Sequence, residues 1–368
     1  MSHAGYESLE QSNRLNSSSR IAALDYLRLA ASICVCISHV LGALRETNHV
    51  LRPLNDIFRY TVIFRVPLLF TISGFVVYLS INGKPQTYSA ISKFLFRRWT
   101  WITVPLCLAL SFTYCYEKML WIGGFPHVPQ RTLVDVISNV LCITSFTNTR
   151  RWIDPTRSLA FELQFYVVTA LIWIMSLKAS GRPFGNLRSQ WLVLGLVLAS
   201  LVADRSYQVE SFGIWHFRWF ALGLMAGMRF SNIDCTWLFR SGILIIGITS
   251  IFEGGGYLVA TKLILVAAIL VVTETDGFNV ANRFIRSSPT FGTISYLIYL
   301  YHWPIASHSG VLVQLCRRLS LVDDYWPLFA ILIPVGVSVL FAKPVYRLCS
   351  WVTSILLAKD ASTSLPVA

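Results

Sequence analysis

The chain has 368 residues, of which 55% are hydrophobic and 13% are charged, and its formal net charge is +13. A soluble globular domain carries about 25% charged residues, so this composition excludes an ordinary soluble protein and indicates a chain that crosses a membrane many times. The basic residues lie in short clusters between apolar runs, and no polar domain could present a nucleic-acid-binding surface. We therefore expect membrane lipids, and no nucleic acid, among its partners.

Ten apolar runs follow residues 1–20, which are polar and have the composition of a disordered tail. Most runs are close to the roughly 20 residues that a helix needs to cross the hydrocarbon core, although 190–203 and 238–252 are short. We expect an all-α, polytopic membrane protein in which 21–357 form one transmembrane domain and 358–368 a polar C-terminal tail. The predicted spans are 21–44, 60–81, 99–121, 158–178, 190–203, 212–230, 238–252, 256–273, 290–314 and 326–357.

Basic residues indicate how these spans are oriented, because cytoplasmic loops are enriched in Lys and Arg. The segment 82–98 contains four basic residues and is expected to be cytoplasmic. With ten spans, both termini then lie in the cytoplasm. We expect the protein in the cell membrane, which is the inner membrane in a Gram-negative bacterium. A further apolar segment, 132–146, contains Asp135 and Asn139 and is expected to form an interfacial or re-entrant helix.

Three ionisable side chains share one stripe of the first run. Arg28 and His39 are eleven positions apart, which is three helical turns plus roughly 20°, with a rise of about 16 Å. Asp25 lies about 40° off this line and within ion-pair reach of Arg28. Ionisable groups are unfavourable in lipid, so such a stripe indicates a functional site. The alternative is that Asp25 and Arg28 mark the membrane boundary and His39 hydrogen-bonds a neighbouring helix.

Five later segments combine polar residues with small or aromatic ones. Gly74, Gly223 and Gly227 favour close helix packing, whereas Arg97 and Arg98 suit phosphate groups or anionic lipid. The segments are Pro67-x-x-Phe70-x-x-Ser73-Gly74-Phe75, Lys93-x-x-x-Arg97-Arg98, Ser158-Leu159-x-x-Glu162-x-x-Phe165-Tyr166, Arg218-x-Phe220-x-x-Gly223 and Gly292-x-x-Ser295-Tyr296-x-x-Tyr299-Leu300-x-His302-x-Pro304.

Together with the spacing of Arg28 and His39, these segments resemble the acyltransferase 3 family of integral-membrane acyltransferases, in the family's order and over nearly all of 21–350. The resemblance implies a transferase that moves an acyl group, usually acetyl, from cytoplasmic acyl-CoA to a hydroxyl of an extracytoplasmic carbohydrate. That acceptor is an exopolysaccharide, a lipopolysaccharide O-antigen or a lipid-linked glycan. Acyl-CoA is a substrate, and we expect no bound cofactor and no metal. The chain departs from the family pattern at Trp101, where Arg is usual, at Arg157, where the motif has Trp, and at Ala342, where it often has Glu.

We predict that His39 is the general base that deprotonates the acceptor hydroxyl, with Glu162 orienting the imidazole or stabilising its charged form. On the expected topology the two side chains lie at similar depth. Glu162 could instead pair with Arg157, and His39 could act as a nucleophile that forms an acyl-histidine. Since the rise from Arg28 to His39 is of the order of a pantetheine arm, we expect the acyl-CoA phosphates on Arg28, Arg97 and Arg98.

Six further residues are expected to support this site. One of them, His302, is predicted to lie deep in its span, at a different level from His39, and to contribute to packing or to an acyl tunnel. The six are Asp25, Ser73, Tyr166, Ser295, Tyr296 and His302.

Two functions from other classes use the same features. A permease or flippase for a lipid-linked glycan would use the buried charges as a substrate path, but no inverted repeat is visible and a carrier does not require a His and a Glu at one depth. A non-catalytic membrane scaffold is disfavoured by the number of buried ionisable groups. The sequence carries no indication of an oligomeric state.

Overall fold

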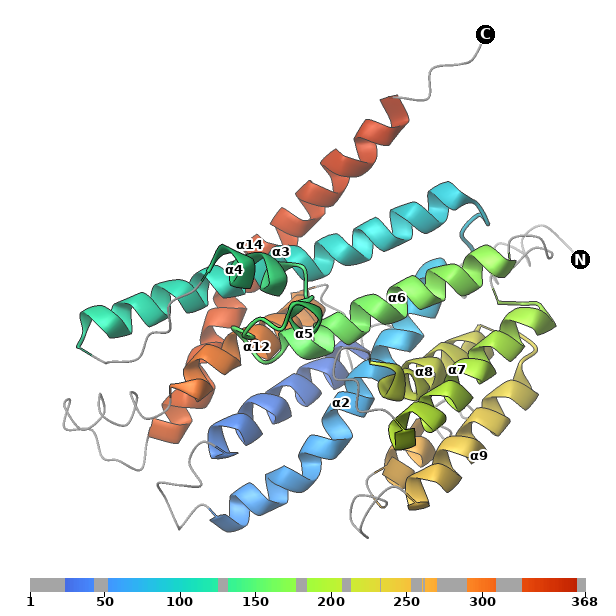
Figure 1. The fold of residues 1–368 in the computed structure, drawn as a ribbon, viewed down its shortest axis with the longest axis horizontal. Coiled ribbons are helices and arrows are strands. Elements are labelled where there is room, and N and C mark those ends of the chain that lie inside the picture. The colour runs from blue at the N-terminus through green and yellow to red at the C-terminus, as the bar shows by residue number, and fades with distance from the viewer. Residues whose placement is uncertain are drawn as a thin grey trace, which may run out of the picture.

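The computed structural model describes residues 24–42, 52–124, 132–176, 184–206, 213–231, 233–252, 260, 262–269, 290–308 and 326–362. Within these ranges every regular element is a helix, which confirms the all-α prediction (Figure 1). Each of the ten predicted apolar runs contains a described helical segment. The predicted N-terminal tail, 1–20, lies outside the described residues.

The helices vary widely in length. After a first helix, Leu24–Gly42, the chain forms α2 (Arg52–Ile81), α3 (Tyr88–Ile122), α4 (Leu133–Val140), α5 (Thr144–Thr147), α6 (Thr156–Ser176), α7 (Leu187–Ser206), the 3-10 helix η2 (Ile214–His216), α8 (Phe217–Phe230), α9 (Thr236–Phe252), α12 (Thr290–Ser307) and α14 (Trp326–Ser362). Thus α14 continues past residue 357, where we predicted the polar tail to begin.

In the described part of the chain, three helices are both long and apolar enough to cross a membrane: Leu24–Gly42, Thr156–Ser176 and Ile331–Ile355. Shorter apolar helices cover Val66–Ile81, Leu187–Val202 and Thr236–Phe252. These helices support a membrane protein, whereas the number of ten spans and the cytoplasmic position of the termini stay predictions.

One face of α6 shows the character of these helices. Val167, Leu171 and Met175 follow one another at intervals of four residues and are 50%, 53% and 45% exposed. On the other face Phe165 and Trp173 are fully buried. An apolar stripe of this kind would be unfavourable in water but is suited to lipid, so α6 packs one face into the bundle and presents an outer face suited to hydrocarbon.

The closest helix packing joins α2 to α8. A Cβ atom at Gly74 would lie 2.1 Å from the carbonyl oxygen of Phe220, and one at Gly223 would lie 1.9 Å from that of Thr71. Both distances are far below van der Waals contact, so only glycine fits at either position. The predicted role of these glycines in helix packing is confirmed, and the contact fixes the position of Ser73 next to Gly74.

The segment 132–155, which precedes α6, folds into a compact unit. Asn139 organises it: its Nδ2 donates to the carbonyl oxygens of Asp135 and Arg150, at 2.8 and 3.0 Å, and its Oδ1 accepts from the Trp152 amide at 2.8 Å. The helix α4 has eight residues and is about 12 Å long, too short to cross a membrane. Because Leu133 and Val134 are exposed on it, the interfacial interpretation is favoured.

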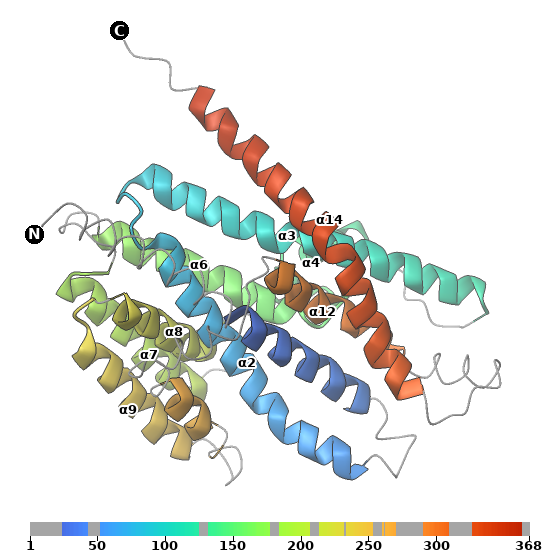
Figure 2. The ribbon, with the colours of Figure 1, turned by 180° about the vertical axis from the view of Figure 1, so that it is seen from behind.

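Figures 1 and 2 show how the helices are arranged. In both views α7, α8 and α9 gather on one side, and α14 crosses α3 on the other, where the rings of Trp101 and Tyr346 meet at 5.4 Å. The turn from α2 to α3 and the turn from α8 to α9 lie at the same end of the bundle in both views, together with the last turn of α6. If successive spans cross the membrane in opposite directions, these three parts of the chain should lie on the same side, as the predicted topology requires.

Candidate active site

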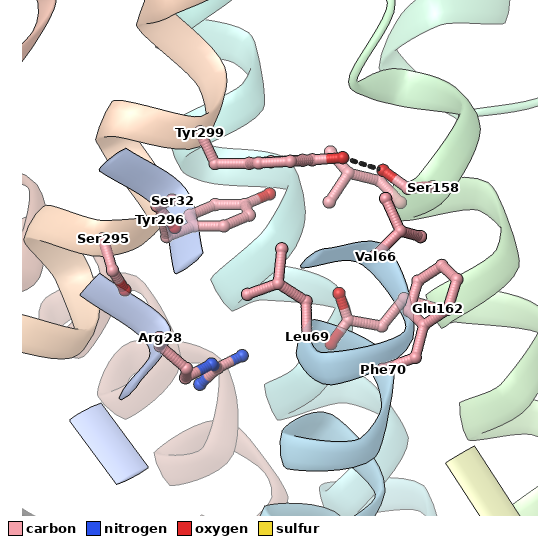
Figure 3. Close-up of a pocket in the computed structure, with 11 residues that line it drawn as sticks. Arg28, Ser32, Val66, Leu69, Phe70, Ser158, Glu162, Ser295, Tyr296 and Tyr299 are labelled. Carbon is pink, nitrogen blue, oxygen red and sulfur yellow. Dashed lines mark hydrogen bonds between the residues drawn. The ribbon is translucent and has the colours of Figure 1, made fainter. Parts of the chain in front are cut away.

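Four helices converge on a cavity of about 50 Å³, which we call the central cavity (Figure 3). Arg28 enters it from the first helix, Glu162 from α6, and Tyr296 and Tyr299 from α12, while apolar side chains of α2 close a further side. Figure 3 shows the Arg28 guanidinium and the Glu162 carboxylate directed toward each other across this space. Two predicted site residues of opposite charge therefore face the same small cavity.

Glu162 is held by two hydroxyl groups. Ser73 and Tyr166 both donate to Glu162 Oε1, and their own oxygens lie 3.2 Å apart. Tyr166 is one turn further along α6, whereas Ser73 comes from α2, where the glycine contact with α8 fixes it. The two O–H donors therefore hold the Glu162 carboxylate in one orientation. The structure thus joins three residues that the sequence placed in two separate motifs.

Arg98 lies beside this group. Its guanidinium carbon is 5.5 Å from the ring centre of Tyr166 and 5.7 Å from that of Phe94, and its Nη2 donates to the Val76 carbonyl oxygen at 3.3 Å. Two aromatic faces and a carbonyl therefore orient a cation next to the Glu162 carboxylate. This arrangement leaves guanidinium N–H groups for a ligand.

A second cavity, of about 200 Å³, lies between Arg98 and the start of the first helix. At its edge Gly292, at the start of α12, packs on Asp25, whose Oδ1 would lie 3.0 Å from a Cβ at that position. We call it the arm cavity. Its charged and hydroxyl-bearing lining residues are Asp25, Arg28, Arg98, Glu162, Tyr166, Thr293, Tyr296 and Tyr346.

The remaining three supporting residues, Ser295, Tyr296 and His302, lie on α12. Tyr296 lines both the central and the arm cavities, and its hydroxyl donates to the Ile102 carbonyl oxygen at 3.2 Å. Ser295 lines the central cavity, and its hydroxyl donates to the Gly292 carbonyl oxygen at 2.8 Å within the helix.

A third cavity, of about 780 Å³, opens where α2 turns into α3. Its described lining includes Lys84, Lys93, Arg97 and Arg98 and no acidic residue. The start of α3 adds the positive end of a helix dipole, which Thr87 caps by accepting the Ala90 amide at 3.2 Å. We call it the basic cavity, and its chemistry suits phosphate groups.

His39 lies beside a second imidazole. The ring centres of His39 and His302 are 5.2 Å apart, and the Trp303 ring is also 5.2 Å from that of His39. The prediction that His302 lies at a different level is therefore wrong. The cause is that the first helix and α12 pack in parallel and start at the same level, with the Tyr26 and Phe291 rings 4.8 Å apart. His39 and His302 each lie about three turns further along their helices, so they reach the same depth.

His302 is fully buried, and its Nδ1 lies 3.1 Å from the Ile298 carbonyl oxygen. A carbonyl oxygen only accepts, so Nδ1 carries the hydrogen and Nε2 is the basic nitrogen of the neutral ring. One turn of helix thus fixes the tautomer of the imidazole that faces His39.

Both histidines line a cavity of about 570 Å³, which we call the histidine cavity. Ser158 and Phe161 also line it, but Glu162 does not, because it points into the central and arm cavities instead. Within the described residues, the hydrogen bonds of Glu162 go to Ser73 and Tyr166, and not to His39 or Arg157. The two predicted catalytic residues therefore occupy successive cavities.

The four cavities share lining residues and form one series. Arg98 lines both the basic and the arm cavities; Glu162 lines both the arm and the central cavities. Ser158 and Tyr299 line both the central and the histidine cavities, and their hydroxyl groups share a hydrogen bond of 2.6 Å at that boundary (Figure 3). A polar path thus leads from a cluster of cations to a pair of imidazoles.

Several residues of this path were missed as site residues from sequence. Ser158 and Tyr299 stand inside quoted motifs, and the four-residue spacing of Ser158 and Glu162 on one helix face could have indicated the first. Lys84 was considered only for orientation, and Lys93 was quoted in the segment with Arg97 and Arg98 without being assigned to the site. In the described residues, no group of three His, Cys, Asp or Glu side chains could hold a metal ion.

Apolar helices around a series of cavities lined by ionisable residues indicate a membrane protein with an internal site. The sequence model of the acyltransferase 3 family, an acyltransferase domain, matches residues 21–343. The chain therefore belongs to the acyltransferase 3 family and is an acyltransferase. Among curated proteins and among solved structures, no match was found.

Proposed function

We propose that the protein transfers a short acyl group, most simply acetyl, from cytoplasmic acyl-CoA to a hydroxyl of an extracytoplasmic carbohydrate. The series of cavities from the basic cavity to the histidine cavity carries this proposal. A donor with a phosphate-rich head and a long thin arm fits such a series, because the head needs cations and the arm needs a narrow path to the reacting group.

The head of the donor fits the basic cavity. Lys84, Lys93 and Arg97 would contact its phosphates, since charge-assisted hydrogen bonds to phosphate are among the stronger polar contacts in proteins. The pantetheine arm would pass Arg98 into the arm cavity, where Arg28 lies at the far side.

The size of the central cavity limits the acyl group. The central cavity, at about 50 Å³, is the smallest of the four, which favours a small acyl group over a long chain. The same limit argues against a permease or flippase, because a lipid-linked glycan is far larger than this point of the path. We therefore favour transfer of the acyl group over passage of the acceptor.

For the chemistry we assign His39 as the general base. It takes the proton of the acceptor hydroxyl while the oxygen attacks the thioester carbonyl carbon; the carbon–sulfur bond then breaks, and the thiolate leaves and regains a proton from the imidazolium. His302, beside it, provides a second basic nitrogen that can share this proton. Ser158 and Tyr299 lie at the boundary of the central and histidine cavities, where Ser158 donates to the Pro155 carbonyl oxygen at 2.8 Å and Tyr299 donates to Ser158 at 2.6 Å.

Glu162 has a different task in this arrangement. It faces Arg28 and lies beside Arg98, so its negative charge balances two cations along the path of the arm and keeps them in place. In this proposal Glu162 positions the donor, whereas the sequence had suggested that it orients His39.

The test is donor-dependent transfer in membranes. Membranes with and without the chain are supplied with acetyl-CoA labelled in the acetyl group, and ester-linked label in surface carbohydrate is measured. We expect label only in the presence of the chain, together with thermal stabilisation of the purified protein by coenzyme A. Absence of both the label and the stabilisation would contradict the proposed function.

A further inference from the structure

Among the described residues that line the histidine cavity, cationic side chains outnumber acidic ones. Its described lining contains three cationic side chains, Arg157, Arg218 and Lys262, and one acidic side chain, Asp154. The Asp154 carboxylate is half exposed and already lies 3.8 Å from Arg151 Nε, which is not part of the lining. A cavity lined mainly by one sign of charge concentrates ligands of the opposite sign.

Aromatic rings accompany these cations. The Arg157 guanidinium carbon is 5.9 Å from the Phe161 ring centre, and that of Arg218 is 5.9 Å from the Trp219 ring centre. Trp215 adds a further ring to the same lining. Rings of this kind keep the cations in place by cation–π attraction and offer flat apolar faces on which the C–H face of a sugar ring can lie.

We infer that the acceptor is an anionic carbohydrate. Its carboxylate or phosphate lies on Arg157 and the neighbouring cations, its ring packs on the aromatic side chains, and the hydroxyl to be acylated reaches His39. The cavity, at about 570 Å³, lies within the roughly 300 to 1,000 Å³ of ordinary ligand pockets. This inference rests on the proposed function, because it names the acceptor class of the same transfer.

Arg157 is the residue on which this inference depends most. It stands at the start of α6, directly before Ser158 at the boundary of the central cavity, and the family motif that the chain otherwise resembles has Trp at this position. The positive charge at this position therefore distinguishes this chain from the family motif. Arg157 would lie between the bound anion and the reacting atoms. Guanidinium groups bind carboxylate and phosphate through paired N–H bonds.

The test measures binding, so that it does not depend on transfer. The purified protein in lipid nanodiscs is titrated by calorimetry with a tetramer of galacturonic acid and with the methyl ester of the same tetramer, which has the same rings and no charge. A second pair of probes is a prenyl-phosphate-linked hexose and its prenyl ether without phosphate. We expect one anionic probe to bind at least about tenfold more tightly than its neutral partner, less so at high salt.

The variant Arg157→Gln should lose most of this advantage, and Lys262→Gln should lower it if the first variant does not fold. The matched control is Arg150→Gln, which removes the same charge from an exposed position outside the cavity and should keep the advantage. Preference for the tetramer assigns the carboxylate as the anion, and preference for the prenyl phosphate assigns the linker.

The outcome separates this inference from the proposed function. Equal binding of charged and neutral partners in both pairs, with transfer from acetyl-CoA intact, would overturn the anionic acceptor and leave the transferase. If Arg157→Gln removes charge-dependent binding but no transfer from acetyl-CoA to any carbohydrate is found, the anion site is supported and the proposed transfer from acetyl-CoA to carbohydrate is overturned.

Discussion

The imidazole rings of His39 and His302 lie 5.2 Å apart at the lining of one cavity, although 263 positions separate them in the chain. In the proposed mechanism one takes the proton of the acceptor hydroxyl and the other is close enough to share it. We therefore expect both histidines to contribute to transfer, and variants of each can distinguish their two roles.

His39→Ala should lower acyl transfer by about 10² to 10⁴, the usual loss for a general base. His302→Asn keeps a donor at the place of Nδ1 for the Ile298 carbonyl and removes only the basic nitrogen. It should lower transfer less, because His39 remains to take the proton of the acceptor hydroxyl. Transfer from labelled acetyl-CoA, normalised to folded protein, measures both. Full activity of His39→Ala would reject the mechanism.

Glu162→Gln separates two roles of the carboxylate. The amide oxygen can still accept from Ser73 and Tyr166, but the charge that balances Arg28 is lost. We expect weaker stabilisation by coenzyme A together with a lower rate of transfer. Had Glu162 oriented His39 or stabilised its charged form, the rate would fall while stabilisation by coenzyme A stayed unchanged.

Much of this site could be predicted from sequence because helical periodicity places residues on a face. The spacing of Arg28 and His39, and that of Glu162 and Tyr166, depend only on the pitch of one helix. Arg28 and Glu162 lining the same cavity, and Ser73 bonding Glu162, agree with the prediction that they belong to one site.

Relations between helices were harder to predict. The depth of His302 relative to His39 depends on how far α12 is shifted along the first helix, and no spacing within either helix encodes that shift. The assignment of Glu162 to the donor side likewise depends on which way α6 is rotated in the bundle. For the same reason Tyr299 and Ser158 had no role until the two helices were seen together.

The basic cavity predicts donor affinity. Removing charge by the double change Lys93→Ala, Arg97→Ala should weaken acyl-CoA binding by about tenfold or more and flatten its dependence on salt, since charge-assisted contacts to phosphate are lost. Lys118→Ala is the control, because Lys118 is exposed near the other end of the same helix, beside Tyr114 and Trp121. Thermal stabilisation by coenzyme A reports the difference; equal stabilisation of both variants would place the donor elsewhere.

The contact between α2 and α8 predicts stability. Gly223→Ala would bring a methyl group to 1.9 Å from the Thr71 carbonyl oxygen, so the helices must separate. Overpacking of this kind is expected to destabilise by about 1 to 3 kcal/mol. Gly195→Ala is the matched control on α7, where an added Cβ meets nothing within 4 Å. Thermal unfolding in detergent should show a lower midpoint for Gly223→Ala and an unchanged midpoint for Gly195→Ala.

The hydrogen bond between Tyr299 and Ser158 lies between the central cavity, which would hold the donor thioester, and the histidine cavity, which would hold the acceptor. We expect it to keep water away from the thioester until the acceptor binds. Tyr299→Phe and Ser158→Ala each remove this 2.6 Å bond at the boundary of the central and histidine cavities, while the rest of either side chain stays. Water from the histidine cavity could then reach the thioester. We expect acyl-CoA hydrolysis to rise relative to transfer in each single variant.

Because both changes break the same bond, the double variant should resemble either single one, and the effects on the ratio of hydrolysis to transfer should not add. Free coenzyme A release and acylated carbohydrate, measured in one reaction, give this ratio. Thr169→Ala is a suitable control, since Thr169 is buried on α6 but lines none of the four cavities. Additive effects would show that the two hydroxyls act separately and that their hydrogen bond does not close the boundary.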